Sequence, residues 1–223
     1  MLKAVIFDID GTLIDSVDLH ARAWVKAFEK YGYQIPFEQL RQQIGKGSEQ
    51  IIPEFISQEA FERLGAKIAD YRKQYYQENL LSKAKPFEKV PELFERLKQD
   101  GLKIVLASSA KEDTIAYYKE KLGIENLIEA ATSTDDVEKS KPHPDIFKAA
   151  LEKLDGVKPE EAIAVGDSPY DAEAAGKISL RTVGVLCGGF SEIVLREAGC
   201  IAIYRDPADL LANYERSPLS SVV

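Results

Sequence analysis

Short apolar runs recur along the chain, and most of them end in polar residues or glycine. The predicted runs are Ala4–Phe7, 102–107, 162–165, 180–185 and a weaker run at Cys200–Tyr204. A short apolar run without alternation is typical of a strand that is buried on both faces. We therefore predict five strands, and the first of them ends directly before Asp8.

Helical spacing of apolar residues fills the segments between the later runs. The expected helices cover 91–99, Glu112–Leu122, 145–154, 171–175 and 191–198. Strands that alternate with helices predict an α/β fold with a doubly wound, Rossmann-like parallel-sheet core. Ligands bind outside the carboxyl ends of the strands in such sheets, so the polar residues that end the runs are expected to share one site.

The stretch 16–82 breaks this alternation and predicts an all-helical insertion. Apolar residues repeat at three- and four-residue spacing around Trp24 and again around Ile68, and shorter helical pieces are expected at 37–43 and 48–56. Trp24 falls on the apolar stripe and is expected in the core of this insertion. We predict a helical domain over 16–82 and an α/β core made of 1–15 and 83–223, with a loose tail at 217–223.

Composition narrows the functional classes. Lys and Arg number 29 against 37 Asp and Glu, and the formal charge of -8 argues against a broad nucleic-acid-binding face. No run approaches the roughly 18 apolar residues of a membrane helix, and the N-terminus has no signal-peptide pattern. Cys187 and Cys200 are too few for a disulfide framework. A reduced, cytoplasmic monomer or weak homodimer is expected, without nucleic-acid or membrane partners.

The segment that directly follows the first strand holds two carboxylates and a hydroxyl close together, in Asp8-Ile9-Asp10-Gly11-Thr12-Leu13. Two carboxylates on the turn that leaves a strand can both face the mouth of the sheet, and Gly11 lets the backbone turn. Alone, this segment is also compatible with an Asx-rich turn. Two acids at a buried strand end repel one another and resist ionisation, and a bound cation removes that objection. We interpret Asp8 and Asp10 as site residues.

Three later segments carry polar groups that suit the same site. Ser108 and Ser109 end the second strand, where a hydroxyl and backbone N–H groups suit a phosphoryl oxygen, although a helix cap is the simpler interpretation of Ser108 alone. Lys141 stands beside prolines that hold the backbone rigid. Asp167 and Asp171 follow the third strand, and such hard oxygen ligands suit Mg²⁺.

These four segments, in this order, resemble the four motifs of the haloacid dehalogenase superfamily. Its phosphatase members carry Asp-x-Asp-x-Thr, a Ser or Thr, a Lys and Gly-Asp-x-x-x-Asp, and all four are present here. The insertion between the first two motifs resembles the helical cap of the subgroup that contains phosphoglycolate phosphatases and β-phosphoglucomutases. The resemblance covers essentially the whole chain, core and cap.

The resemblance implies a Mg²⁺-dependent phosphatase of small phosphorylated metabolites, of the phosphoglycolate or sugar phosphate type. It makes Asp8 the nucleophile that forms an aspartyl-phosphate and Asp10 the general acid and base. It assigns Mg²⁺ to the side chain of Asp8, the backbone carbonyl of Asp10 and Asp167. It further assigns the binding of the phosphoryl group to Ser108, Ser109 and Lys141. Asp171 and Thr12 are expected next to the residues that bind the metal and the phosphoryl group.

Two residues of the insertion are expected to act in substrate selection. His20 matches a histidine of β-phosphoglucomutase-like members and would meet Asp10 on cap closure, while a polar place on the cap helix explains it equally well. Lys46, between two glycines, would reach a second charged group of the substrate. Mutases carry an arginine where Glu49 stands here, so a phosphatase is favoured over a mutase.

Several alternatives stay open at this point. One is a β-phosphoglucomutase-like phosphosugar mutase, and another is a dehalogenase, although dehalogenases lack the second acid that Asp10 provides. A third is a non-catalytic phosphate-binding module similar to response-regulator receivers, which are shorter and lack an inserted cap. The fold cannot choose among phosphoglycolate, sugar phosphates and nucleotides as substrates.

Overall fold

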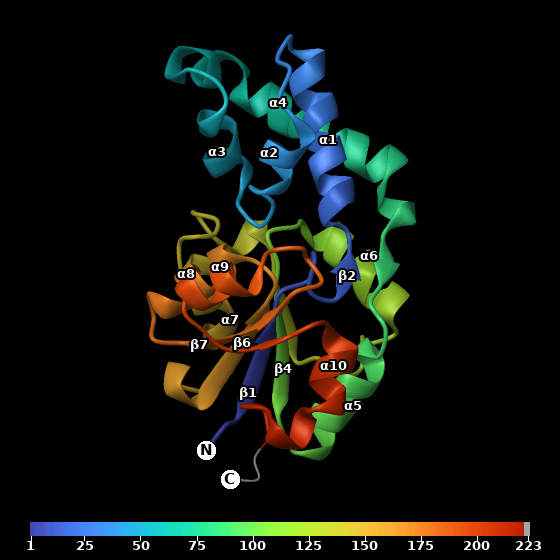
Figure 1. Ribbon diagram of the computed structural model, residues 1–223, viewed down its shortest axis with the longest axis vertical. Coiled ribbons are helices and arrows are strands. Elements are labelled where there is room, and N and C mark those ends of the chain that lie inside the picture. The colour runs from blue at the N-terminus through green and yellow to red at the C-terminus, as the bar shows by residue number, and fades with distance from the viewer. Residues whose placement is uncertain (221–223) are drawn as a thin grey trace. The chain divides into compact units, whose positions relative to one another are not determined.

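The computed structural model describes residues 1–220, except for the side chain of Asp135, and shows two compact units (Figure 1). We call Met1–Asp15 with Pro86–Val223 the core unit and Ser16–Lys85 the helical unit. The helical unit ends at Lys85, whereas the sequence pattern predicted that it ends at residue 82. No helix among the described residues is both long enough and apolar enough to cross a membrane.

A six-stranded sheet forms the centre of the core unit. Its strands are β1 (Ala4–Phe7), β4 (Lys103–Ala107), β5 (Ala130–Thr132), β6 (Ala162–Gly166), β7 (Arg181–Val185) and β8 (Cys200–Tyr204). Neighbouring strands are parallel in the order β5-β4-β1-β6-β7-β8. Every residue of β1 is buried, which is why this interior strand shows an unbroken apolar run. All five predicted strands are confirmed.

Helices cover both faces of this sheet. On one face, Ala4 and Ile6 join a buried cluster with side chains of α7 (Asp145–Glu152) and α8 (Pro169–Gly176). On the other face, Phe7 packs against Phe94 of α5 (Val90–Gln99), with 4.8 Å between ring centroids. The core unit also contains α6 (Glu112–Leu122), α9 (Glu192–Glu197) and α10 (Pro207–Ala212). The predicted doubly wound α/β core is confirmed.

The register of β1 determines which residues meet at the carboxyl edge of the sheet. Phe7 pairs with Leu106 of β4 and with Val165 of β6. Asp8 therefore leaves β1 level with the ends of both neighbours, which continue into Ser108 and Asp167. The chain moves outward to β4 and β5 on one side of β1 and to β6, β7 and β8 on the other. Such a reversal of strand order is where doubly wound sheets bind ligands.

The helical unit consists of four α-helices and two single turns of 3-10 helix. They are α1 (Val17–Lys30), α2 (Phe37–Arg41), α3 (Ser48–Ile51), η1 (Ile52–Glu54), α4 (Gln58–Asn79) and η2 (Leu81–Lys83). Trp24 is 2% exposed and shares an apolar core with Phe28 and Ile68, as predicted. The linking segments β2 (Ile14–Asp15) and β3 (Lys85–Pro86) pair as a small sheet.

The apolar pattern did not predict β5 and α10. Strand β5 has three residues, too few for periodicity to distinguish a strand from a loop. Helix α10 begins at Pro207, directly after Asp206, where the apolar pattern predicted no helix. Asp206 Oδ1 accepts a hydrogen bond from the backbone N–H of Asp209 at 2.8 Å, and Pro207 occupies the first turn. This N-cap was therefore a sequence signal for the helix.

The predicted loose tail is wrong for residues 217–220, while 221–223 lie outside the described residues. Ser217 and Leu219 are buried. The hydroxyl of Tyr214 donates to the backbone carbonyl of Leu219, 3.2 Å away, and lies 2.8 Å from Asp100 Oδ2. Asp100 directly follows α5, and Figure 1 shows α10 beside that helix. The C-terminal segment is therefore anchored on α5.

A small ionic network strengthens this anchor. Arg96 forms an ion pair with Asp100, and its Nη2 lies 2.7 Å from Glu215 Oε1. Burial by itself raises the pKa of Asp100, but the hydrogen bonds from Arg96 and Tyr214 and the charge of Arg96 lower this pKa below its ordinary value. At pH values above about 4, the ordinary pKa of an aspartate, ionised Asp100 therefore stabilises the fold. This contribution is lost as the pH falls through the lowered pKa.

We predict that Asp100→Asn lowers the free energy of unfolding by about 1 to 3 kcal/mol at pH 7, because hydrogen bonds to a charged group are lost. The difference from the wild type should shrink as the pH falls below about 4. Urea denaturation at pH 7 and at pH 3 measures both effects. Asp155→Asn, which alters an exposed carboxylate, is the matched control. Equal losses for the two variants at pH 7 would contradict the prediction.

Candidate active site at the carboxyl edge of the sheet

Asp8 and Lys141 form a buried ion pair at the end of β1. Lys141 Nζ lies 2.6 Å from Asp8 Oδ1, and the two side chains are 1% and 9% exposed. Lys141 Nζ also donates to the backbone carbonyl of Ala107, the last residue of β4, at 3.2 Å. A buried ammonium needs such partners, because an unpaired buried charge costs several kcal/mol. These contacts hold Lys141 between the ends of two strands.

Asp171 contacts Lys141 as a second carboxylate. Its Oδ1 lies 2.7 Å from Lys141 Nζ. Its Oδ2 accepts hydrogen bonds from the backbone N–H and the hydroxyl of Ser168, at 3.1 and 2.6 Å, in a capping box at the start of α8. A Cβ atom at Gly166 would come within 2.5 Å of Asp171 Cγ, so a glycine is needed to leave room for this carboxylate. Asp171 is thus fixed by the helix cap.

Thr12 connects the acidic ends of β1 and β6. Its hydroxyl lies 3.2 Å from Asp167 Oδ1 and 3.4 Å from Asp8 Oδ2. All three side chains are buried. Since a hydroxyl carries one proton, Thr12 can donate to one of the two carboxylates at a time. Thr12 therefore orients this pair without neutralising it.

Negative charge exceeds positive charge in this buried group. One carboxylate oxygen each of Asp8, Asp167 and Asp171 lies within 4.8 Å of the others, and Lys141 supplies a single positive charge. Burial raises the pKa of Asp8 to about 7; the charge of Lys141 opposes this rise, and the charges of Asp171 and Asp10 add to it. Burial, followed by the charges of Asp171 and Asp8, raises the pKa of Asp167 well above its ordinary value.

Lys141 stays protonated in these surroundings. Burial alone lowers the pKa of its ammonium, but the carboxylates of Asp171 and Asp8 outweigh burial and raise that pKa. Three hard oxygen donors that share one monovalent cation fit a divalent cation such as Mg²⁺. The donor set and its excess negative charge therefore suit the metal expected from the sequence.

Ser108 lies buried directly after β4, beside the carbonyl of Ala107 that Lys141 contacts. Its Oγ accepts a hydrogen bond from the backbone N–H of Ala110 at 3.0 Å, so the hydroxyl proton can serve a further acceptor. Ser109 follows in the same bend and is partly exposed. Asp10 is partly buried in the loop after β1, where its charge acts on Asp8.

His20 and Lys46 lie in the helical unit. His20 is on α1, 5% exposed, and stacks on Tyr76 with 4.0 Å between ring centroids. Its Nδ1 lies 2.7 Å from Arg72 Nη2 and is the acceptor in this contact, because a guanidinium can only donate. Lys46 Nζ lies 3.5 Å from Glu54 Oε1. Both predicted residues therefore have polar partners inside their own unit.

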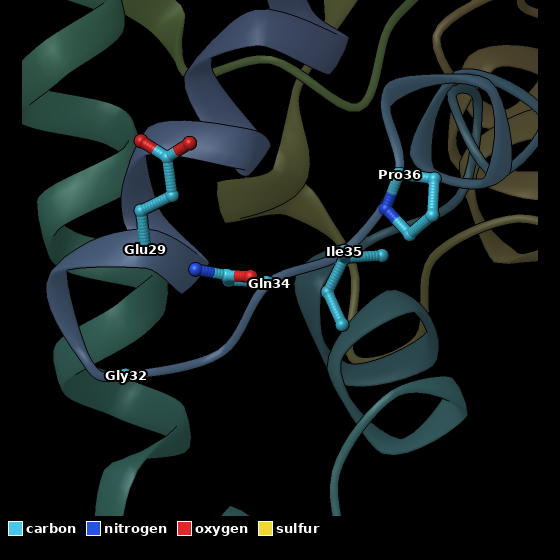
Figure 2. Close-up of a pocket in the computed structure, with 5 residues that line it drawn as sticks. All are labelled: Glu29, Gly32, Gln34, Ile35 and Pro36. Atoms are coloured by element: carbon cyan, nitrogen blue, oxygen red, sulfur yellow. The ribbon is translucent and has the colours of Figure 1, made fainter.

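Figure 2 shows a hollow on the helical unit, near the connection between α1 and α2. It encloses about 520 Å³ and is lined by Glu29, Gly32, Gln34, Ile35 and Pro36. These lining residues include none of the predicted site residues. All five lining residues belong to the helical unit.

The sequence suggested that Cys187, in the loop after β7, borders the site, but it assigned this loop no role in the reaction. The thiol of Cys187 donates to the backbone carbonyl of Gly11 at 3.2 Å. A Cβ atom at Gly188 would lie 1.7 Å from Asp167 Oδ2, so the loop backbone packs directly on this carboxylate. Burial, with the charges of Asp167 and Asp206, raises the pKa of Cys187, which keeps the thiol protonated. The two glycines that follow the end of β7 were a sequence signal for a close approach of this loop to the site. They were not used as one because glycine carries no reactive group.

We predict that, in EDTA, the free energy of unfolding falls by a few kcal/mol between about pH 4 and about pH 7, since one pKa unit corresponds to about 1.4 kcal/mol. A carboxyl group with a higher pKa in the folded state stabilises the fold fully below its ordinary pKa. This contribution is lost as the pH rises through the folded value, about 7 for Asp8. Urea denaturation measures the change, and Asp8→Asn should make it smaller, with Asp167 causing the remainder. A pH-independent wild type would contradict the prediction.

Comparison with known proteins identifies similar chains. The family model for haloacid dehalogenase-like hydrolases matches residues 5–185. A protein of Caldanaerobacter subterraneus subsp. tengcongensis, provisionally named pyrophosphatase PpaX, is 32% identical over 185 residues, which cover 82% of this chain and 81% of that protein. The phosphoglycolate phosphatase of Aquifex aeolicus is 27% identical over 188 residues, which cover 84% of this chain and 86% of that protein.

A solved structure agrees with the fold over nearly its full length. The crystal structure of a hydrolase from Pseudomonas syringae matches with a TM-score of 0.86 and 29% sequence identity. The match covers 97% of this chain and 99% of that chain. It therefore includes the helical insertion as well as the sheet.

Proposed function

This chain belongs to the haloacid dehalogenase-like hydrolase family, and from that premise we propose that it is a Mg²⁺-dependent phosphatase of small phosphate monoesters. Membership confirms the resemblance that the four motifs indicated and the prediction of a phosphatase-type hydrolase. The observation that carries the proposal is the buried group of Asp8, Asp167 and Asp171 around the single ammonium of Lys141.

Asp8, Asp167 and the backbone carbonyl of Asp10 are the proposed Mg²⁺ ligands. Carboxylate and carbonyl oxygens are donors that Mg²⁺ prefers, and the excess negative charge of the buried group favours a cation. Bound Mg²⁺ supplies charge neutralisation for the attacking carboxylate and the phosphoryl oxygens. Asp171 is assigned to hold Lys141 in place, because its two oxygens already contact Lys141 and Ser168.

Asp8 is the proposed nucleophile and Asp10 the proposed general acid and base. A carboxylate oxygen of Asp8 attacks phosphorus, the bond from phosphorus to the leaving oxygen breaks, and Asp10 protonates that oxygen. Water then attacks the phosphorus of the aspartyl-phosphate while Asp10 accepts a proton from the water. The bond between Asp8 and phosphorus breaks, which releases phosphate and restores the carboxylate.

Lys141, Ser108 and Ser109 are proposed to bind the phosphoryl group. Lys141 stands 2.6 Å from Asp8 Oδ1, where its charge offsets the repulsion between an attacking carboxylate and an anionic phosphate. The hydroxyl of Ser108 and the backbone N–H groups that follow β4 can donate to phosphoryl oxygens. Thr12 is assigned to orient Asp8 and Asp167, between which its hydroxyl lies.

We further propose that the helical unit is a cap that selects the substrate, with His20 and Lys46 as specificity residues. Phosphoglycolate and pyrophosphate, the substrates in the names of two relatives, both carry a second anionic group beside the transferred phosphoryl group. Lys46 is a cation whose side chain is 14% exposed, near Glu54. A substrate with a second anionic group is therefore the proposed class.

We predict that Asp8→Asn abolishes Mg²⁺-dependent phosphate release and that Asp10→Asn lowers kcat by about 100- to 10,000-fold, the usual range for a general acid or base. The assay compares Mg²⁺ with EDTA on phosphoglycolate, pyrophosphate, hexose 6-phosphates, β-glucose 1-phosphate and nucleoside monophosphates. Mass spectrometry of rapidly quenched enzyme should find a phosphoryl group on Asp8.

Asp155→Asn serves as the control for the loss of one carboxylate, because Asp155 is exposed. Phosphate release that survives Asp8→Asn would exclude Asp8 as the nucleophile. If no compound releases phosphate but β-glucose 1-phosphate is isomerised, the phosphosugar mutase replaces the phosphatase.

We predict that Lys46→Ala raises KM about tenfold for substrates with a second anionic group, as expected when a hydrogen bond between two charged groups is lost. The KM for p-nitrophenyl phosphate, which lacks such a group, should stay the same. Lys67→Ala, at an exposed lysine of α4, is the matched control. A KM that rises equally for both kinds of substrate would remove Lys46 from substrate selection.

A further inference from the structure

We propose that residues 186–189, which we call the β7 loop, position the acidic groups of the active site: Gly188 makes room for Asp167, and Cys187 holds the turn at Gly11. This inference rests on the proposed function, because it assigns supporting residues to the same site. Neither residue contacts the substrate in this assignment. Both act through the residues they touch.

The first contact is between the backbone of the β7 loop and the carboxylate of Asp167. A Cβ atom at Gly188 would lie 1.7 Å from Asp167 Oδ2 and 2.4 Å from its Cγ. Gly188 is not among the glycines with positive φ, so an alanine would be disfavoured by this overlap and not by its backbone conformation. Asp167 would have to move away from its place beside Thr12, whose hydroxyl lies 3.2 Å from Oδ1. The oxygens assigned to Mg²⁺ would then no longer converge.

The second contact is between the thiol of Cys187 and the carbonyl of Gly11. The distance from Sγ to the carbonyl oxygen is 3.2 Å, and the two residues are 176 positions apart in the chain. Gly11 has φ +87° and separates Asp10 from Thr12. A donor at this carbonyl therefore restrains the peptide between the proposed acid and the residue that orients Asp8 and Asp167.

A third contact joins the residue after the β7 loop to the start of α8. Phe190 meets Tyr170 edge to face, with 6.1 Å between ring centroids. Strand β7 pairs with β6, so the loops after these two strands leave the same edge of the sheet. The β7 loop therefore spans the turn after β1 and the turn after β6, which carry Asp8 and Asp167.

Gly188→Ala tests the first contact without any turnover. Isothermal titration with Mg²⁺ alone should show affinity weakened by about tenfold or more, the range seen when a supporting group of a metal ligand is altered. Gly176→Ala is the matched control, because nothing lies within 4 Å of a Cβ atom there and its φ is not positive. The control should keep the affinity of the wild type.

Cys187→Ala and Cys187→Ser test the second contact. The alanine variant lacks the donor and should lower kcat about tenfold with KM unchanged, while the serine variant should restore most of kcat because its hydroxyl can still donate. A merely structural role would not give this rescue together with an unchanged KM. Cys200→Ala controls for the loss of a buried thiol that packs with Ala172 and Leu195.

The outcomes separate this inference from the proposed function. Unchanged Mg²⁺ affinity in a folded Gly188→Ala, or full activity of Cys187→Ala, beside an active wild type overturns this inference alone. A wild type that neither binds Mg²⁺ nor releases phosphate overturns both. If circular dichroism shows that Gly188→Ala does not fold, the two Cys187 variants decide.

Discussion

The core unit depends on one buried charge, the ammonium of Lys141. It lies 2.6 Å from Asp8 and 2.7 Å from Asp171, and its side chain is 1% exposed. Such a charge is tolerated only with close partners, so β1 and α8 must each deliver a carboxylate to it. A third buried acid, Asp167, leaves the group with more negative than positive charge. The same imbalance that strains the isolated group is what makes it suitable for a divalent cation.

The parallel sheet explains why stability and chemistry meet at one edge. Buried residues of β1, β4 and β6 pack between two layers of helices, and polar residues begin where these strands end. Because β1 is flanked on both sides, Asp8 has neighbours from two strands, and the reversal of strand order opens the sheet edge there. The apolar runs can therefore stabilise the fold while the polar residues after them form the proposed site.

Sequence reasoning succeeded where the signal is local and periodic. The unbroken apolar runs predicted five strands, and the spacing around Trp24 predicted a buried stripe on α1. It failed at β5, which is too short for a period, and at α10, where the N-cap at Asp206 was not recognised. The predicted loose tail failed for another reason. Its order comes from Asp100, a residue more than a hundred positions away.

The sequence by itself determined the succession of strands and helices along the chain and the set of polar residues at the strand ends. It could do so because periodicity and motif spacing are properties of neighbouring residues. Only the tertiary structure decided which of these residues touch. Lys141 meets Asp8 across 133 positions, and Cys187 meets Gly11 across 176. Such contacts follow from strand register and packing summed over the whole core unit. For the same reason, no local pattern could show that Gly188 leaves the space in which Asp167 lies.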